Sequence, residues 1–149
     1  LRLTTHAGED GGSAYVWEAI QECGVERIDH GVQSAEDPDL LRELADRQIL
    51  LTVCPISNIA LKVFPSMQQH SLPKLVEAGI PVCLNSDDPP MFDSNLIREF
   101  EVVDETFDFS HEQLISMLRN ALQHSFQADA DKAQLLAEFD RIKDDYFGA

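Results

Sequence analysis

The sequence contains few cysteines, and their placement excludes two classes of protein. Cys23, Cys54 and Cys83 are the three cysteines, and no two of them form a Cys-x-x-Cys pair. Neither a disulfide framework nor a zinc–thiolate site is therefore indicated. Isolated thiols of this kind suit a reducing compartment, so we expect a cytoplasmic protein.

Positive charge is also scarce. Lys and Arg number 11 against 27 Asp and Glu, which gives a formal net charge of -16. A surface this acidic repels the phosphates of nucleic acids and of anionic membranes, so we expect neither as a partner. It would also serve a phosphorylated substrate poorly, and a neutral small molecule is the better expectation.

Long hydrophobic runs and a secretion signal are absent from these residues. No apolar run approaches the roughly 18 residues that a membrane span needs, and no charged segment followed by an apolar stretch opens the sequence. With 149 residues, 44% of them hydrophobic, the composition is that of one soluble domain covering residues 1–149. The sequence begins without Met inside a predicted strand, which suggests that this domain is incomplete.

Short apolar segments alternate with segments of helical spacing. Strands are predicted at 1–5, 25–28, 49–53 and 80–84. Helices are predicted between them, at 14–23, 38–45 and 71–78, and after them, at 94–106, 110–126 and 129–146. This alternation predicts an α/β protein with a parallel sheet covered by helices.

Several helix starts carry capping signals. Ser13 and Asp37 are the expected N-caps of the first two helices, and Ser71 with Pro73 is expected to start the third. Ser110 and Gln113 have the spacing of a capping box at the start of the segment 110–126.

Each predicted strand is followed by polar residues that can do chemistry. The four segments are Thr5-His-Ala-Gly-Glu9, Arg27-Ile-Asp-His-Gly31, Cys54-Pro-Ile-Ser-Asn58 and Asn85-Ser-Asp-Asp-Pro89. The marked positions His6, His30 and Cys54 lie 24 residues apart, and Asp87 follows Cys54 by 33 residues. Since the carboxyl ends of parallel strands collect ligands and catalytic groups, these segments predict one shared site.

The adjacent carboxylates Asp87 and Asp88 are the most informative pair. Two like charges at the end of a buried strand repel each other unless a cation or a shared proton compensates. Imidazole and carboxylate ligands on rigid strand ends suit zinc. The pattern therefore indicates a metal site or acid–base chemistry.

Each of these residues also has a structural interpretation. A single His after a strand is often only hydrogen-bonded, Glu9 could cap the following helix, and Asp88 could cap a turn. Cys54 is interpreted as a small core residue. We interpret three further histidines as surface or packing residues: His70, His111 and His124. Four polar segments after four successive strands favour a functional site over this interpretation.

Taken in order, the four segments resemble the motifs of the adenosine/adenine deaminase family, within the amidohydrolase superfamily. The resemblance runs from about residue 1 to residue 126 and is to the C-terminal half of that family. It implies strands five to eight of a (β/α)8 TIM-type barrel, followed by C-terminal helices. It also implies a hydrolase that uses one zinc ion, Zn2+, to convert a 6-aminopurine into the 6-oxopurine and ammonia: adenine into hypoxanthine, or adenosine into inosine.

The resemblance further implies roles for the catalytic residues. His6 would be a zinc ligand, and Asp87 would both ligate zinc and accept the proton of the attacking water. Glu9 would act as a carboxylic acid toward purine N1. His30 would orient the zinc-bound hydroxide.

Two residues would contact the purine itself. Gly8 would belong to the pocket wall, and Asp88 would hydrogen-bond purine N7. The small-molecule purine would be free adenine, adenosine or an N6-substituted adenine, and the sequence leaves these three open.

The sequence departs from the family pattern in one respect. The family carries a His-x-His pair on its first strand that supplies two zinc ligands, and these 149 residues contain none. Four strands cannot close an eight-stranded barrel, so we expect the chain to need the missing N-terminal half-barrel, with a homo-oligomer left open. One alternative is another amidohydrolase. Its binuclear form is disfavoured, because no lysine stands at a strand end to be carbamylated and bridge two metal ions. The other alternative is an inactive fragment.

We predict that the isolated 149-residue chain has little deaminase activity, because half of the zinc ligands are missing from it. A sensitive assay of the purified chain for ammonia release checks this. Full turnover by the isolated chain would contradict the prediction.

Overall fold

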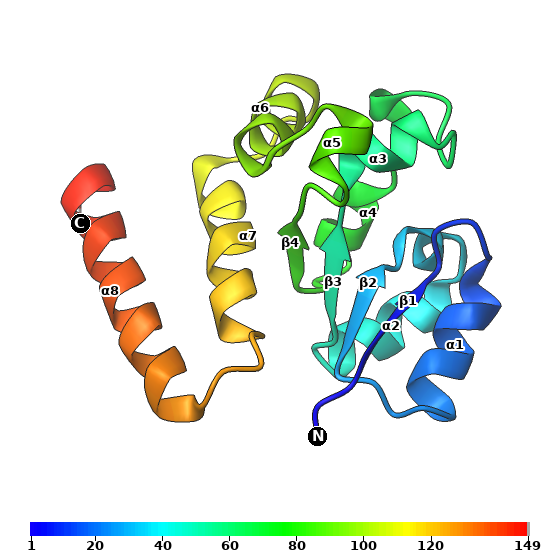
Figure 1. The fold of residues 1–149 in the computed structure, drawn as a ribbon, viewed down its shortest axis with the longest axis horizontal. Helices are drawn as coiled ribbons and strands as arrows, with labels where there is room; N and C mark the ends of the chain where they lie inside the picture. The colour runs from blue at the N-terminus through cyan, green and yellow to red at the C-terminus, as the bar shows by residue number, and fades with distance from the viewer. Residues whose placement is uncertain (149) are drawn as a thin grey trace.

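The computed structural model describes residues 1–148, in which four parallel strands form one sheet (Figure 1). In chain order and in space these are β1 (Thr4–Ala7), β2 (Arg27–His30), β3 (Leu50–Val53) and β4 (Val82–Leu84). The predicted α/β order with four parallel strands is confirmed. The strand bounds differ: β1 begins at Thr4, and β2 continues to His30.

The strand register gives the sheet one apolar face and one polar face. Side chains alternate along a strand, so aligned residues form rows on the same face. One row consists of the half-buried Thr5 and of Ile28, Leu51 and Val82, which belong to the core. The next row faces the opposite side and consists of His6, Asp29, Thr52 and Cys83. The sequence suggested apolar strands, but one face of the sheet is polar. This polar row provides the floor of a site.

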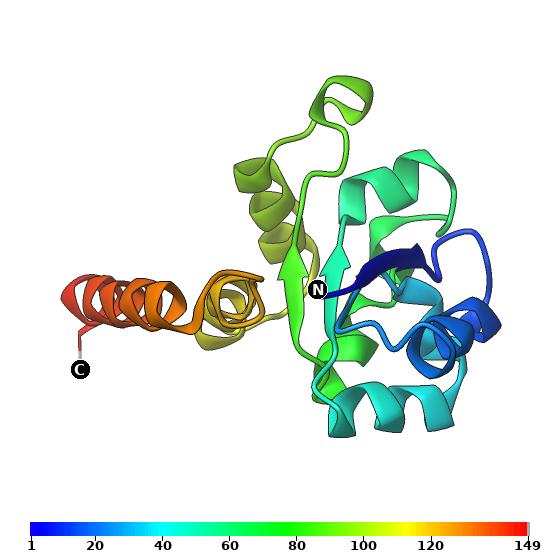
Figure 2. The same ribbon diagram turned by 60° about the horizontal axis from the view of Figure 1, so that its bottom comes forward.

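The apolar face is covered by helices that follow the strands. These are α1 (Ser13–Gln21), α2 (Pro38–Asp46) and α4 (Leu72–Glu77), with the 3-10 turn η1 (Val32–Glu36) between β2 and α2. Figures 1 and 2 show these helices on one side of the sheet. Leu40, Leu44, Leu72 and Leu75 are fully buried there, and each such side chain contributes about 1.5–3 kcal/mol relative to an exposed one.

The remaining helices lie beyond β3 and β4. They are α3 (Pro55–Ala60), the 3-10 turn η2 (Met67–Gln69), α5 (Pro89–Phe92), α6 (Leu96–Thr106), α7 (His111–Gln123) and α8 (Asp129–Phe147). Helix α7 packs along β4, where the Asn120 side chain donates to the Val82 carbonyl at 3.0 Å. Helix α8 packs on α7 and extends away from the sheet (Figure 1). Its link to α7 includes a bidentate ion pair between Arg119 and Asp140.

Two of the three capping predictions are confirmed, and the third helix starts at Ser71 as predicted. Asp37 accepts from the backbone N–H groups of Asp39 and Leu40, and Ser110 with Gln113 forms a complete capping box. Ser13 is wrong as a cap, because Gly12 occupies the N-cap position of α1. Ser71 occupies the N-cap position of α4, but its hydroxyl donates to the Val32 carbonyl instead.

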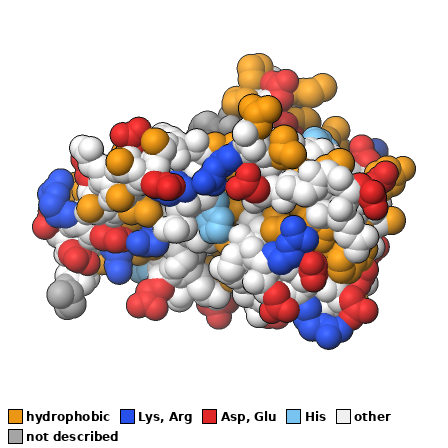
Figure 3. All heavy atoms as spheres, turned by 90° about the horizontal axis from the view of Figure 1, so that it is seen from below, with side chains coloured by type: hydrophobic (Ala, Val, Ile, Leu, Met, Phe, Trp, Pro, Cys, Tyr) orange, Lys and Arg blue, Asp and Glu red, His pale blue; other side chains and the backbone are white. Residues whose placement is uncertain are grey.

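The surface is consistent with the acidic composition. On the face shown in Figure 3, Lys and Arg side chains are interspersed with Asp and Glu rather than gathered in one area. Among the helices of residues 1–148, none combines the length and apolarity needed to cross a membrane.

Ser110→Ala should lower the free energy of unfolding by about 1 kcal/mol, because it leaves the Gln113 N–H at the start of α7 without its cap. Chemical denaturation of the full-length protein measures this. Ser116→Ala on the same helix is the matched control, since the exposed Ser116 hydroxyl only donates to the Glu112 carbonyl. Equal effects of the two substitutions would contradict the prediction.

Candidate active site

Four residues from the ends of three strands converge beside the polar face of the sheet. His6 Nε2 lies 3.0 Å from Glu9 Oε2, and His30 Nδ1 lies 3.2 Å from Glu9 Oε1. On the other side of the His30 ring, Nε2 lies 4.0 Å from Asp87 Oδ2. The rings of His6 and His30 are tilted against each other with centroids 4.4 Å apart. The structure thus brings together the residues that the sequence predicts as metal-binding and catalytic.

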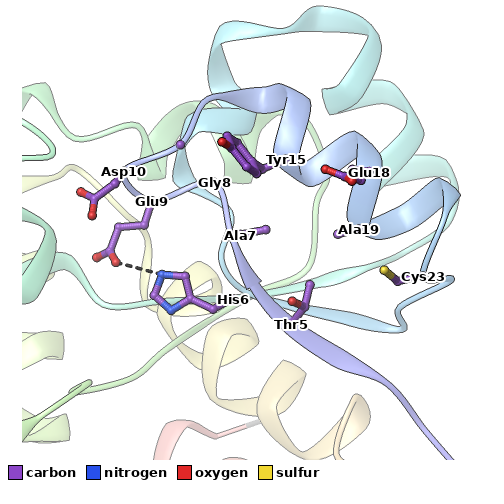
Figure 4. A pocket seen from close by; sticks show the side chains of 11 residues that line it. Thr5, His6, Ala7, Gly8, Glu9, Asp10, Tyr15, Glu18, Ala19 and Cys23 are labelled. Carbon is purple, nitrogen blue, oxygen red and sulfur yellow. Dashed lines mark ion pairs between the residues drawn. The ribbon is translucent and has the colours of Figure 1, made fainter.

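Figure 4 shows how β1 positions two of these side chains. His6 points away from α1, while Thr5 and Ala7 point toward it, as strand alternation requires. The chain then turns back at Gly8, and the Glu9 carboxylate returns to the His6 ring (Figure 4).

Left-handed backbone places the other two side chains. His30 has φ 68° and Asp87 has φ 55°, a region that costs most residues energy although Asp and His enter it more readily than others. Alternation alone would put His30 on the helix side with Ile28, so the left-handed turn lets its ring reach Glu9 and Asp87. Such conformations concentrate at functional sites.

Glycine at position 8 is required by crowding within the protein. Gly8 has φ 69°, and a Cβ there would lie 2.5 Å from Val16 Cγ2 and 3.3 Å from Gly31 Cα. The close contact is with helix α1 and the β2 turn. Gly8 also lines a hollow of 640 Å3 beside β1, and its place in the wall of a purine pocket stays a prediction.

Glu9 is a buried carboxylate held from two sides. Only 4% of the residue is exposed, and Asn58 Nδ2 donates to its Oε1 at 2.7 Å. A buried carboxylate is costly unless it is hydrogen-bonded or charge-paired. Glu9 does not cap the following helix: Gly12 occupies the N-cap position of α1, and no side chain caps that helix.

His30 is buried and its protonation is disfavoured. Burial lowers the pKa of His30, and the charge of His6 lowers it further. The charge of Glu9 acts in the opposite direction and raises this pKa. The Nδ1 atom of His30 faces Asn58 and Glu9, and its Nε2 atom faces Asp87. A neutral imidazole can donate a hydrogen bond through one of these nitrogens and accept one through the other.

Asn58 and His70 are site residues whose roles the sequence does not reveal. Asn58 lies within the short helix α3 with 0% of its surface exposed. Its amide also contacts His30 Nδ1 at 3.3 Å. His70 Nε2 lies 3.1 Å from Asn58 Oδ1. His70 is buried, so the interpretation as a packing residue describes its burial but misses its polar contact.

Glu99 is a third residue whose role the sequence does not reveal, and it connects two segments of the site. It is fully buried in α6. Its carboxylate accepts from the Ser94 hydroxyl at 2.7 Å and from the Ile56 N–H at 3.1 Å. It therefore ties the segment after Asp87 to the first turn of α3. Its position within an otherwise amphipathic helix gave no signal in the sequence.

The polar row forms the wall of a hollow next to these residues. The hollow has a volume of 460 Å3 and is lined by His6, Arg27, Asp29, His30, Thr52, Cys54, Asn85, Ser86 and Asp87. Within it Thr52 donates to Asp29 Oδ1 at 2.8 Å. A second hollow of 640 Å3 lies between β1 and α1 and shares the His6–Glu9 loop (Figure 4).

Two groups of donors are close enough to share a metal ion. They are His6, Glu9 and His30, and His30, Cys54 and Asp87. Nitrogen and carboxylate oxygen donors suit zinc. Burial raises the pKa of the Cys54 thiol, and the charges of Asp87 and Glu99 add to this, so Cys54 is a neutral core thiol, as the sequence predicted.

Asp88 is placed differently from its neighbour. Its side chain is exposed and accepts from the Met91 N–H at 3.2 Å, which caps the short helix α5. The structure thus shows the capping contact that the sequence left as an alternative. Its contact with a purine stays a prediction.

The model of the adenosine deaminase family matches residues 1–142. The chain belongs to this family. The adenine deaminase of Hahella chejuensis is 44% identical over 141 residues, and the aminodeoxyfutalosine deaminase of Streptomyces avermitilis is 41% identical over 140 residues. These alignments cover 95% and 94% of this chain but only 42% and 39% of the two relatives.

Solved structures place the chain within a larger fold. The crystal structure of adenine deaminase from Arthrobacter aurescens has a TM-score of 0.89 and 40% identity, covering 95% of this chain and 43% of that one. A zinc-bound amidohydrolase from Burkholderia ambifaria has a TM-score of 0.86 and 29% identity, covering 97% and 42%. The four-stranded unit is the C-terminal half of a TIM-type barrel, as the sequence resemblance implied.

Glu99→Gln should gain stability relative to the unmodified protein as the pH rises. Burial raises the pKa of Glu99, so its favourable contribution is present when it is protonated and is lost as the pH rises through its folded-state pKa. Denaturation of the full-length protein and of the variant from pH 4 to pH 7 measures the difference.

Glu99→Leu is the contrasting variant, because it leaves the Ile56 N–H and the Ser94 hydroxyl unpaired. It should lose about 1–3 kcal/mol for each unpaired group. A stability difference between Glu99→Gln and the unmodified protein that does not change with pH would contradict the assignment.

Proposed function

We propose that the protein containing this chain is a zinc-dependent hydrolase that converts a 6-aminopurine into the 6-oxopurine and ammonia. The observation that carries the proposal is the convergence of His6, Glu9, His30 and Asp87 at the carboxyl ends of β1, β2 and β4. Family membership supports it, because relatives at 41–46% identity bear the names of adenine and related deaminases.

His6 and Asp87 are the residues of this chain that would hold the zinc ion. Their imidazole and carboxylate groups line the same hollow, and the zinc-bound relative from Burkholderia ambifaria supports the choice of metal. The remaining ligands would come from an N-terminal half-barrel. When bound, zinc supplies a water molecule acidified toward neutral pH and a Lewis acid beside the substrate.

Glu9 would deliver a proton to purine N1. Asn58 donates to its Oε1. Its Oε2 lies 3.0 Å from His6 Nε2, and this oxygen would carry the proton for the substrate once His6 is a zinc ligand. A proton on N1 makes C6 more electrophilic, so that water can add there. General acid catalysis of this kind contributes about 10²- to 10⁴-fold in rate.

Asp87 and His30 would manage the proton of the attacking water. Asp87 accepts this proton. The neutral His30 ring, whose Nε2 lies 4.0 Å from Asp87 Oδ2, orients the water for attack on C6. The proton then passes to the amino group, the C6–N bond breaks, and ammonia departs. The proton left on the C6 hydroxyl returns to Glu9 as the 6-oxo group forms. Gly8 would shape the pocket wall, and Asp88 would reach N7 by giving up its capping contact.

Adenine is the first candidate substrate. Relatives named adenine deaminase include those of Hahella chejuensis and Sinorhizobium medicae, the latter 46% identical over 137 residues. Aminodeoxyfutalosine is the second, since the relative of that name is 41% identical. A solved complex with IMP, at 25% identity, shows that a more distant relative binds a 6-oxopurine nucleotide. The net charge of -16 favours an uncharged purine over a nucleotide.

The three free cysteines agree with the cytoplasmic location expected from the sequence, which remains part of this proposal. An assembly of several copies remains a prediction.

The test is ammonia release by the full-length, zinc-loaded protein with adenine, adenosine and aminodeoxyfutalosine. We expect turnover of adenine, removal of activity by a chelator, and recovery with zinc. Glu9→Gln should reduce kcat by about 10²- to 10⁴-fold. Asp10→Asn, an exposed carboxylate in the same loop, should leave kcat unchanged. No ammonia from any of the three substrates would overturn the proposal.

A further inference from the structure

We propose that His70 is a positioning residue that fixes the Glu9 carboxylate through the side-chain amide of Asn58. The catalytic part of this inference rests on the proposed function, whereas the hydrogen-bond arrangement does not. His70 comes from the connection between α3 and α4, and it touches neither Glu9 nor His30 directly.

A single backbone group sets the direction of the whole chain of hydrogen bonds. The Leu72 N–H, which can only donate, points at His70 Nδ1 at 3.0 Å. Nδ1 is therefore the acceptor, and the proton of the neutral ring lies on Nε2. Burial lowers the pKa of His70 to about 4, which keeps the ring neutral.

The His70 tautomer in turn decides which way the Asn58 amide faces. Nε2–H donates to an oxygen, so Oδ1 is the Asn58 atom at 3.1 Å from His70. The Asn58 NH2 group is then directed at Glu9 Oε1, 2.7 Å away. A flipped amide would bring two donors together at His70 and two acceptors together at Glu9. Asn58 and His70 are 0% and 4% exposed, so water cannot relieve either conflict.

The long connection after β3 explains why His70 can reach Asn58. The interval from Cys54 to Asp87 exceeds the 24-residue interval of the earlier strand ends, and the excess lies in this connection. It folds back on itself: the Val63 N–H donates to the Asn58 carbonyl at 2.9 Å, and the Phe64 ring lies against the His70 ring with centroids 4.5 Å apart. The extra residues thus supply a buried support for the site.

This arrangement has a consequence for catalysis. A carboxylate held at one oxygen keeps the other directed at the reacting position, and positioned groups lose effectiveness when they gain freedom. Loss of the His70 contact should therefore slow the chemical step and leave zinc and purine binding intact.

The test compares two variants of the full-length, zinc-loaded protein. His70→Leu removes the donor to Asn58. We expect kcat to fall by up to roughly 100-fold, the cost of misplacing a positioned catalytic group, with KM and zinc content unchanged. His70→Gln keeps a donor for Asn58 and an acceptor for the Leu72 N–H, and it should recover most of the lost kcat.

His124→Leu is the matched control. His124 is a half-buried histidine at the end of α7, remote from Glu9, and the same substitution there should leave kcat unchanged. Equal losses in His70→Leu and His70→Gln, or an increase in KM without a change in kcat, would overturn the positioning role.

Nitrogen NMR of the histidine rings tests the hydrogen-bond arrangement without any substrate. His70 should show a proton on Nε2 alone from pH 6 to pH 8, and the Asn58 side-chain amide should exchange slowly with solvent. A proton on Nδ1, or a doubly protonated ring at pH 7, would overturn the inference. This measurement decides the matter if His70→Leu fails to fold, or if the unmodified protein deaminates no purine and the proposed function is wrong.

Discussion

The buried amide of Asn58 connects the parts of the site that come from different strands. It joins the loop after β1 through Glu9, the turn after β2 through His30, and the long connection through His70. Each of these groups is buried and polar, so each would be costly alone. The Asn58 amide donates to Glu9 and accepts from His70. The three loops can therefore pack together without water and hold the Glu9 carboxylate in a fixed position.

This network depends on the alternation of the sheet beneath it. Parallel register aligns every second residue of the four strands, so one face carries Ile28, Leu51 and Val82 and packs on helices. The opposite face carries His6, Asp29 and Thr52 and lines a hollow. The same backbone pairing therefore supplies both the core and the floor of the site. The left-handed backbone at His30, the last residue of β2, turns its side chain away from the helix side.

Local sequence signals were sufficient for the residues next to the strand ends. His6, Glu9, His30 and Asp87 each follow a short predicted strand within a few residues, and parallel topology then requires them to meet. Asn58 was visible as part of a motif, but its partners were not. Glu99 gave no signal, because its two hydrogen bonds, to Ser94 and Ile56, form only when α6 packs on the start of α3.

The sequence by itself determined the order of strands and helices, the family, and the set of polar strand ends, because these follow from periodicity and from short motifs. The tertiary structure decided which polar groups touch. His70 was grouped with packing residues because nothing near it in the chain reports a contact with Asn58, 12 residues away. Hydrogen bonds between buried side chains depend on how the connections fold over the strand ends, and that geometry is fixed only when the core packs.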